Sequence, residues 1–416
     1  MVRRHRFGVG FALGAAIVAA GVATILLRPR SGLIDPQVVE ASAYFTPQEL
    51  DRAESFRGPQ RALAVAELAL TTGALALVAL RPPRRVRRAL ERAARRPYLG
   101  GAAAGAGLSV GLALVALPID AIQHERAADV GLATQDWGPW LLDVGKSVGV
   151  GALLAGALTA GALVLVRRFP RRWWLPGSAA VAALAALYLY VAPVTLDRLF
   201  NDFEPLPEGR LRADVLALAE RAGVDVGEVY RVDASRRTTG ANAYVGGLGH
   251  TKRVVLYDNL VEGFPPEQVR TVVAHELGHV AHRDLLRGLA WLAIVAPFAV
   301  LLVQRLTERW APEEPRRASA RTVPALTLAF TLVAFGATCA GNVLSRDVEA
   351  AADAYALRLT GDPAAFVEFE RRIALRNVAD PDPPRLWQAL FGTHPTIVER
   401  IGAGLSAPRQ GTRAAP

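Results

Sequence analysis

The sequence predicts a mainly α-helical protein that crosses a membrane about seven times. The first observation is composition: 52% of the 416 residues are hydrophobic, and they are concentrated in separate runs. The second is the length of these runs, roughly 16 to 20 residues each, because about 20 helical residues span the hydrocarbon core of a bilayer. The third is that arginines cluster beside the runs, which is typical of segments that flank membrane helices.

Seven apolar runs mark the expected membrane helices. Several contain closely spaced glycine and alanine, which lets helices approach one another in lipid. The runs are Gly8–Leu27, Ala62–Leu80, Leu99–Leu117, Ser147–Val166, Leu175–Val191, Gly288–Val303 and Leu326–Leu344. The first run follows the basic segment MVRRHRF, as a signal peptide would, but its apolar core is too long and no small-residue cleavage pattern precedes Arg28. We therefore expect it to be retained as a helix.

The arginines beside the membrane helices account for the net charge of +10. The largest clusters, Arg81–Arg96 and Arg167–Arg172, directly follow two apolar runs, and Trp173 and Trp174 fit an interfacial belt. This placement indicates membrane-flanking charge, so we expect a lipid bilayer and not a nucleic acid as the partner. The one cysteine, Cys339, lies in an apolar run, so the sequence offers neither an internal disulfide nor a thiolate metal cluster.

Two hydrophilic blocks, 201–287 and 345–416, contain the other expected elements. In the first, GRLRADVLALAERAGV has helical spacing, GEVYRVD and KRVVLYD are strands, and TTGANAYVGGLGHT is a strand closed by a Gly-rich turn. Pro265–Leu289 predicts one long helix with proline in its first turn. In the second block, Ser345–Gly361 predicts a helix that Gly361 ends.

A metal site is indicated by the segment HELGH. Its two histidines, His275 and His279, are four residues apart, so on a helix they lie on one face and can bind a single ion. H-E-x-x-H is the signature of metalloproteases in which the histidines bind zinc and the glutamate, here Glu276, is the general base. The alternative is a polar helix face with two histidines that bind nothing.

A catalytic zinc ion takes three protein ligands and keeps one position open. His282 shares the helix face, but it lies roughly 10 Å along the axis from His275 and cannot reach the same ion. Glu349, in the segment SRDVEAAADAYA, is the better third ligand. Asp353 lies one turn further on and can accept the free N–H of a ligand histidine. The alternative is a solvated acidic helix face with an ion pair from Arg346. We place both Asp353 and Arg346 beside the metal ligands.

Six segments together carry a family resemblance. They are, in chain order, YFTPQELDRAESFRGPQRA, DRLFNDFEPLPEGRLRADVLALAERAGV, ANAYVGGLGHTKRVVLYDNLV, HELGH, SRDVEAAADAYA and THPTIVERI. With these segments the chain resembles the type I CAAX prenyl endopeptidases, zinc metallopeptidases embedded in membranes, over most of Ala43–Ile401. Two positions depart from the family pattern: Ala241 replaces a serine before the asparagine, and Thr396 replaces a second proline after His394. Neither departure removes a metal ligand.

The resemblance implies one zinc ion per chain, held by His275, His279 and Glu349, with Glu276 as general base. It also implies a fold in which the helices enclose a water-filled chamber that a catalytic domain of helices and a small β-sheet closes. The partner that it implies is a peptide or protein substrate, with a prenylated C-terminal tail as the family's substrate class.

The resemblance further implies that Asn242 and His394 line the cleft near the scissile carbonyl. Their chemistry agrees with this role, because a tetrahedral oxyanion needs a donor beside the metal and a strand at Asn242 can pair with an extended substrate. Without the resemblance, THPTIVER would be a capped helix start and GANAYVGG an edge strand with turn glycines.

The expected division of the chain follows from these assignments. Residues 1–200 form a membrane domain with five helices, 201–287 the first part of the zinc domain, and 288–344 the last two membrane helices. Residues 345–405 complete the zinc domain with the third ligand, and 406–416 form a disordered tail. We expect a multi-pass protein of a bacterial cell membrane.

Three alternatives for the function stay open at this point. A membrane quality-control metalloprotease of the heat-shock type also has HExxH, although the seven helices argue against it. A non-catalytic protein that uses zinc for folding or binding is the second, although such proteins usually lose the base or a ligand. The third concerns the substrate, because no residue indicates a prenyl pocket and cleavage of other membrane proteins is equally compatible with the sequence.

The distribution of arginine predicts the side of the membrane that the site faces. Loops at the end that carries the N-terminus hold most of the basic residues, including Arg81–Arg96, and loops at the other end are poorer. Because cytoplasmic loops carry the excess of Lys and Arg, and seven crossings put the two ends on opposite sides, the HELGH block falls outside the cytoplasm. The family resemblance implies the reverse, a cytosolic catalytic face. We expect the arrangement that the charges indicate.

Overall fold

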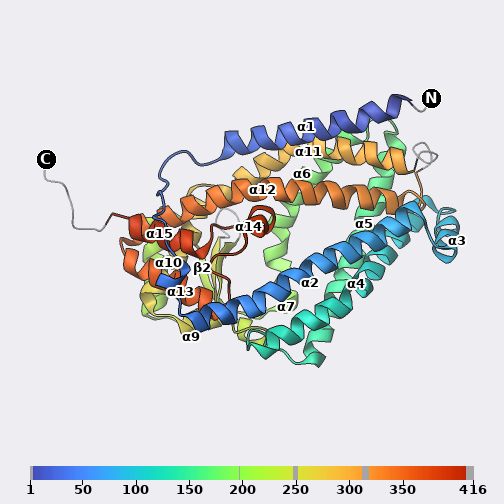
Figure 1. The fold of residues 1–416 in the computed structure, drawn as a ribbon. Coiled ribbons are helices and arrows are strands. Elements are labelled where there is room, and N and C mark those ends of the chain that lie inside the picture. The colour runs from blue at the N-terminus through green and yellow to red at the C-terminus, as the bar shows by residue number, and fades with distance from the viewer. Residues whose placement is uncertain (1–2, 196, 247–251, 312–317, 409–416) are drawn as a thin grey trace.

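The computed structural model describes residues 3–195, 197–246, 252–311 and 318–408, and it is mostly helical (Figure 1). Within these residues, seven helices are long and apolar enough to cross a membrane, which confirms the number expected from the sequence. These helices are α1 (Arg3–Leu27), α2 (Pro47–Leu80), α4 (Pro97–Asp129), α5 (Trp137–Arg168), α6 (Trp174–Thr195), α11 (Asp284–Trp310) and α12 (Val323–Thr360).

Helix α12 continues well beyond a bilayer. It has 38 residues and therefore spans roughly 57 Å, against about 30 Å of hydrocarbon. The helix predicted over Ser345–Gly361 is confirmed, but it does not begin at Ser345: it is the last part of α12, because no glycine or proline interrupts the chain between Leu344 and Thr360. It ends where predicted, at Gly361, whose φ is 65°. The expected domain border between residues 344 and 345 thus lies inside one helix.

The predicted helix Pro265–Leu289 is in fact two helices. The N-terminal part is confirmed, since α10 (Pro266–Ala281) begins with proline. The chain then leaves the helix at Arg283, whose φ of 55° is left-handed, a conformation that a right-handed helix cannot accommodate. Helix α11 starts directly afterwards, so this turn redirects the chain from the zinc motif into the membrane.

Helices α4 and α5 pack against each other along their length. A Cβ atom on Gly105 would lie 2.2 Å from Thr159 Oγ1 and 2.8 Å from the carbonyl oxygen of Ala155. A Cβ atom on Gly101 would likewise lie 2.2 Å from a methyl carbon of Leu163. The glycines therefore set the distance between these two helices, as the small-residue spacing predicts.

The shorter elements are gathered mainly at the end of the bundle that holds α10, apart from the basic helix α3 (Arg84–Ala93) at the opposite end (Figure 1). They are η1 (Ala41–Ala43), α7 (Asp197–Phe200), β1 (Phe203–Pro205), α8 (Arg210–Arg221), β2 (Glu228–Val232), η2 (Ala234–Arg236), β3 (Ala243–Gly246), β4 (Arg253–Tyr257), α9 (Asp258–Gly263), α13 (Pro363–Arg376), α14 (Arg385–Phe391) and α15 (Ile397–Ser406).

The strands form one small mixed sheet with the order β1-β2-β4-β3. β2 and β4 are parallel, with Val229 opposite Val254, and β3 pairs antiparallel with β4. The sequence predicts β2, β3 and β4, and the structure confirms them; β1 is too short to give a pattern. The Gly-rich turn expected after β3, at residues 247–251, and the tail from residue 409 lie outside the described residues.

The core of this end packs the sheet against the surrounding helices. Val254 and Leu256 of β4, together with Val273 and Leu277 of α10, have no exposed surface. Residues of α8 and α13 complete the same cluster. One face of α10 is therefore fixed against the sheet, and the histidines of HELGH are held by a helix that cannot rotate.

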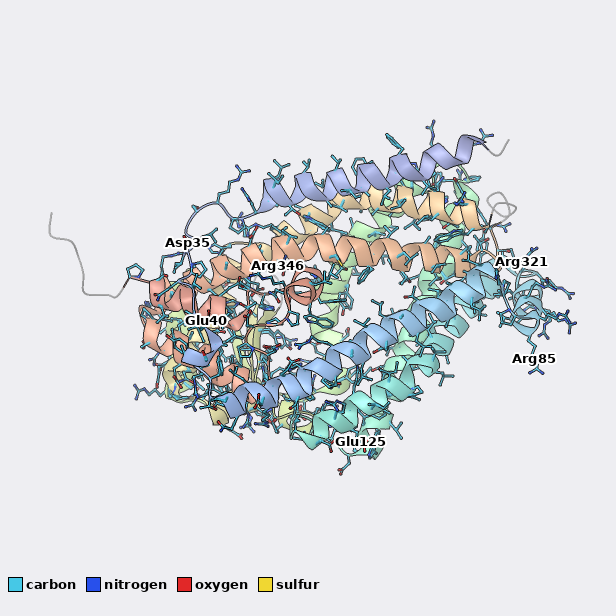
Figure 2. All side chains as sticks on the ribbon, viewed as in Figure 1. Asp35, Glu40, Arg85, Glu125, Arg321 and Arg346 are labelled. Atoms are coloured by element: carbon cyan, nitrogen blue, oxygen red, sulfur yellow. The ribbon has the colours of Figure 1, made fainter. Side chains whose placement is uncertain are left out.

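Arginines from separate basic segments of the sequence lie together at one end of the bundle. Figure 2 shows Arg85 and Arg321 at the end far from α10, near the N-terminus of α1. Helix α3, which contains five arginines in its sequence RRVRRALERA, lies at the same end. By the positive-inside rule, we expect this arginine-rich end in the cytoplasm and the end that holds α10 outside it.

Reporter fusions test this orientation. We expect alkaline phosphatase fused after Pro416 to be active, because it folds only outside the cytoplasm, and a fluorescent protein inserted between Arg95 and Arg96 to fluoresce. The measurement is the ratio of the two signals for each fusion site. A fluorescent C-terminal fusion combined with an active phosphatase at Arg95 would show the opposite orientation, which the family resemblance implies.

Candidate metal centre and cleft

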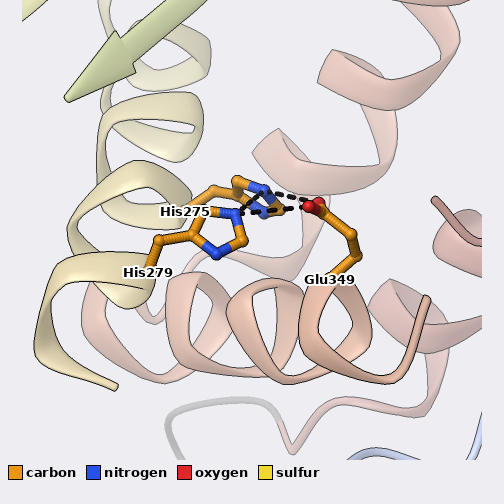
Figure 3. Close-up of side chains that lie close together, drawn as sticks. All are labelled: His275, His279 and Glu349. Atoms are coloured by element: carbon orange, nitrogen blue, oxygen red, sulfur yellow. Dashed lines mark hydrogen bonds and ion pairs between the residues drawn. The ribbon is translucent and has the colours of Figure 1, made fainter. Parts of the chain in front are cut away.

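The two histidines of HELGH project from one face of α10. His275 is buried, at 6% exposure, and His279 lies one turn further along the helix. Gly278 allows α12 to pack closely against α10, because a Cβ atom at this position would lie 3.1 Å from the ring of Tyr355 on α12. This close crossing brings Glu349 of α12 to the histidines (Figure 3).

The potential ligand atoms of the three side chains converge within 4.8 Å of one another. The two Nε2 atoms are 3.1 Å apart. Glu349 Oε2 lies 3.2 Å from His275 Nε2, and Glu349 Oε1 lies 3.6 Å from His279 Nε2. Ligands about 2.05 Å from a tetrahedral ion are separated by roughly 3.3 Å, so this spacing fits a zinc ion.

Each histidine is oriented by a carboxylate behind it. His275 Nδ1 lies 2.8 Å from Asp353 Oδ1, and His279 Nδ1 lies 2.9 Å from Asp284 Oδ2. Such partners keep the proton on Nδ1 and leave the Nε2 lone pair for a metal. The sequence predicts Asp353 in this position, but it misses Asp284, which comes five residues after His279 and beyond the end of α10.

Two features of the site fit a cation. With both protons on Nδ1, the two Nε2 atoms lie 3.1 Å apart with their lone pairs facing each other. These lone pairs repel each other, and a cation bound to both nitrogens removes the repulsion. In addition, Glu349 Oε2 is buried, and no hydrogen bond of normal geometry reaches it. A buried carboxylate oxygen without a hydrogen bond requires an explanation, and a metal ion between the three side chains provides one.

The carboxylates make the site favourable for positive charge. Burial by itself lowers the pKa of His275, but the neighbouring carboxylates of Asp353 and Glu349 raise it to about 10. Burial likewise lowers the pKa of His279, and the neighbouring carboxylates of Asp284 and Glu349 raise it to about 9. A bound metal ion would take the place of these protons, since only neutral imidazole binds a metal.

A buried ion-pair network supports Asp353. Arg400 of α15 donates two hydrogen bonds to it, Nε to Oδ2 at 2.8 Å and Nη2 to Oδ1 at 2.6 Å. Arg400 Nη1 also lies 2.8 Å from Glu370 Oε2, and burial raises the pKa of Glu370 to about 7. The segment THPTIVERI contains Arg400, but nothing in its spacing distinguishes this arginine from a surface residue.

Glu276 lies between the metal site and strand β3. Burial raises the pKa of its carboxyl, while the two histidines and the backbone N–H of Val245 act in the opposite direction. The side chain borders a cleft of about 430 Å³. His275, Asn242 and His394 line the same cleft, so the structure brings these sequence-predicted residues together.

Asn242 is exposed and directly precedes β3. Its carbonyl oxygen accepts a hydrogen bond from Tyr257 N–H at 3.1 Å, which ties it to β4. Among the described strands, β3 is at the edge of the sheet. The preceding residue, Ala241, is held by the Asn377 side chain, because Asn377 Oδ1 accepts a hydrogen bond from Ala241 N–H at 2.9 Å. The segment is thus fixed, and Gly240, Ala241 and Asn242, which lead into β3, line the cleft together with His275.

His394 reaches the site from a loop. Its Nε2 lies 3.2 Å from Glu349 Oε2 and its side chain is 55% exposed, so it is accessible to a substrate. Thr393 Oγ1 lies 2.8 Å from Nδ1. When this hydroxyl donates to Nδ1, Nε2 carries the proton and can donate into the cleft.

Arg346 positions this loop and does not form the ion pair that the sequence suggests for it. It donates to the carbonyl oxygens of Gln388 and Gly392, at 3.2 and 2.7 Å. Figure 2 shows Arg346 beside α14. His282 caps the C-terminal end of α10 and packs edge-on against Tyr355. It lies outside the group of convergent ligand atoms, as expected from the rise of the helix.

Comparison with known proteins agrees with this geometry. Residues 205–406 match the family model described as peptidase family M48. Residues 71–202 match the model described as the CAAX prenyl protease N-terminal region with five membrane helices. The two models together cover His275, His279 and Glu349 and most of the membrane helices that precede them.

Individual relatives support the same grouping. The chain is 30% identical over 300 residues to the uncharacterised metalloprotease YhfN of Bacillus subtilis (strain 168), and the alignment covers 71% of this chain and 70% of that protein. It is 32% identical over 143 residues to CAAX prenyl protease 1 of Saccharomyces cerevisiae, or 34% of this chain and 31% of the yeast protein.

The fold is that of a solved structure. The crystal structure of S. mikatae Ste24p superposes with a TM-score of 0.77, covering 96% of this chain and 98% of that chain at 19% identity. This likeness shows the fold, and the relatives and family models show the class of enzyme. The chain therefore belongs to peptidase family M48 as a multi-pass membrane metalloprotease.

Proposed function

We propose that the chain is a zinc endopeptidase that binds one ion through His275, His279 and Glu349. The observation that carries this proposal is the convergence of their ligand atoms within 4.8 Å on two crossing helices. Their mutual spacing and the buried Glu349 oxygen without a hydrogen bond support zinc as the occupant. The zinc dependence that is general in family M48 agrees with this assignment.

When bound, zinc would polarise the scissile carbonyl and lower the pKa of a water molecule. Glu276 takes the proton from the attacking water and later passes it to the leaving amine. Its place on the cleft wall, within the electrostatic influence of both histidines, supports this role. The pKa of Glu276 is raised by burial, which makes it a stronger base than an exposed carboxylate.

The substrate is held as an extended strand. β3 offers a strand edge next to Glu276, and pairing with such an edge fixes the backbone of a peptide irrespective of its sequence. His394 Nε2 donates to the oxygen of the scissile carbonyl as negative charge develops on it, and Asn242 positions the chain beside it. The yeast relative is named for prenylated C-terminal tails, and we propose such a tail as one substrate to test on this chain.

Replacing the base tests the mechanism most directly. Glu276→Gln keeps the size of the side chain and all three ligands, so we expect bound zinc to be unchanged. Hydrolysis of a quenched peptide should fall by at least about 100-fold, as is typical when a general base is lost. Glu267→Gln, at the exposed start of the same helix, is the matched control. Loss of zinc together with activity would contradict the role of Glu276.

Metal analysis tests the ligands. Glu349→Ala leaves two protein ligands and should lose most of the zinc, whereas His282→Ala should retain it. Asp353→Ala should weaken zinc binding or activity by roughly 10- to 100-fold, because it removes a partner of a ligand histidine and not a ligand. Full zinc occupancy in Glu349→Ala would rule out the third ligand, and loss of zinc in His282→Ala would restore the alternative set.

Kinetics separate the roles of the two cleft residues. His394→Ala and Asn242→Ala should keep zinc and lower kcat, by up to about 100- to 1,000-fold for a residue that donates to the oxyanion. Both constants should be measured with the same peptide at saturating and limiting concentration. A rise in KM alone for His394→Ala would assign this residue to substrate binding.

A further inference from the structure

A second groove lies behind one wall of the catalytic cleft. It has a volume of about 510 Å³ and is lined by Arg52 from the start of α2 and by Arg372 and Arg376 from α13. All three arginines are exposed. The other lining residues are uncharged: Val130, Gly131, Thr239, Gly263, Phe264, Leu375 and Val378. The groove therefore gathers three positive charges with no carboxylate in its lining.

The three guanidinium groups are held in place by backbone carbonyl oxygens. Arg52 Nη2 donates to Val130 O at 2.8 Å, and Arg376 Nε donates to Thr239 O at 2.7 Å. Arg372 Nη1 donates to Gly263 O at 3.4 Å. Each contact uses one N–H group and leaves others available, so the cations are oriented in advance for a ligand.

Neighbouring arginines have carboxylate partners. Arg371, next to Arg372, lies 3.1 Å from Glu49 Oε1, and Arg61 lies 2.7 Å from Asp380 Oδ2. In the part of the chain that the structure describes, none of the three groove arginines forms such an ion pair. Uncompensated positive charge in a concave site attracts anions, and the fork of a guanidinium matches a carboxylate.

The groove and the cleft share a wall that is one layer of backbone thick. Thr239 and Gly131 face the groove, while Thr238, Gly240 and Leu132 face the cleft. Hydrogen bonds tie the two segments together, including Thr239 N–H to Leu132 O at 2.9 Å. The segment leads directly into Asn242 and β3, so a peptide bound along the strand edge needs only a few more residues to cross this wall.

The position of the groove argues against the head group of a bilayer lipid as the ligand. Arg52 precedes the apolar run at Ala62 by ten residues, or roughly 15 Å of helix. The head-group layer on each side of the hydrocarbon is about 5 to 8 Å thick. The groove thus lies beyond this layer, on the same side as the catalytic cleft.

We propose that this groove binds acidic side chains of the peptide substrate, several residues away from the scissile bond. The proposal rests on the peptidase activity proposed above. The groove would increase the affinity for substrates that carry a cluster of Asp or Glu, without contact with the reacting atoms. Exposed ion pairs each contribute up to a few-fold in affinity, so three arginines predict a preference of roughly tenfold.

Three quenched peptides with one common cleavable core test the proposal. One carries three Asp or Glu residues about six positions before the scissile bond, one carries them about six positions after it, and one carries Asn and Gln instead. Six extended residues span roughly 20 Å. We expect one of the two acidic peptides, the one whose acidic residues reach the groove, to have a KM about tenfold below that of the neutral peptide at low salt. Its kcat should equal that of the neutral peptide, and the difference in KM should shrink at high salt.

Variants then assign the preference to the groove. Arg52→Gln, Arg372→Gln and Arg376→Gln retain a donor for the carbonyl oxygens, and the triple variant should raise KM for the acidic peptide to the neutral value. Arg210→Gln, an exposed arginine at the start of α8, is the control for charge elsewhere on the domain. Hydrolysis of the neutral peptide by the wild-type protein tests the peptidase activity separately.

Two results would overturn the proposal. The first is equal KM values of the wild-type protein for the acidic and neutral peptides at low salt, which requires no variant to fold. The second is a preference for the acidic peptide that survives in the triple variant with intact zinc content. A preference that Arg210→Gln reduces as much as Arg376→Gln would likewise assign it to overall charge and not to this groove.

Discussion

The close crossing of α10 and α12 is the constraint on which the rest of the site depends. The two histidines come from one helix and the glutamate from the other, so the distance between the helix axes sets how closely the three side chains converge. Gly278 permits this distance, since a larger residue would meet the ring of Tyr355. The buried face of α10 against β4 fixes its rotation. A small change at either contact would move the histidines relative to Glu349 by more than a metal site tolerates.

The charges behind the ligands explain why so many ionisable groups are buried together. Asp353 has one oxygen near His275 and accepts two hydrogen bonds from Arg400, which in turn contacts Glu370. Burying such charges is costly, and a network of this kind is weak evidence for stability. Its value here is positional, because Arg400 lies on α15 and thereby connects the C-terminal helix to the ring of a ligand. Burying these charges costs free energy, and in return the network fixes the orientation of the His275 ring that the proposed metal site needs.

Sequence patterns predict the parts of the molecule that depend on local rules. Run length predicts the seven membrane helices, and the four-residue spacing of His275 and His279 predicts their common face. The ends of helices were harder to predict: the chain turns at Arg283 without glycine or proline, and it continues straight past Ser345, because tertiary packing decides both. Asp284 and Arg400 could not be found from the sequence, since Asp284 lies beyond the end of α10 and Arg400 meets Asp353 and Glu370 from other helices, contacts that only the fold determines. Asp353 could be found, because it lies one helical turn from Glu349.

Long helices also connect the cleft to the membrane bundle. α12 is continuous from its apolar run to Glu349, and α2 carries Arg57 at the catalytic end. Arg57 donates to the carbonyl oxygens of Asn377 and Val378, and Asn377 Oδ1 in turn accepts a hydrogen bond from Ala241 N–H, just before β3. Val378 has a φ of 46°, a strained conformation for a β-branched residue that persists only when its surroundings hold it. The strand edge is therefore positioned from the membrane domain as well as from the sheet. A shift of α2 would reach Ala241 in the cleft lining through Arg57 and Asn377, which makes the arrangement of the membrane helices part of the geometry of the cleft.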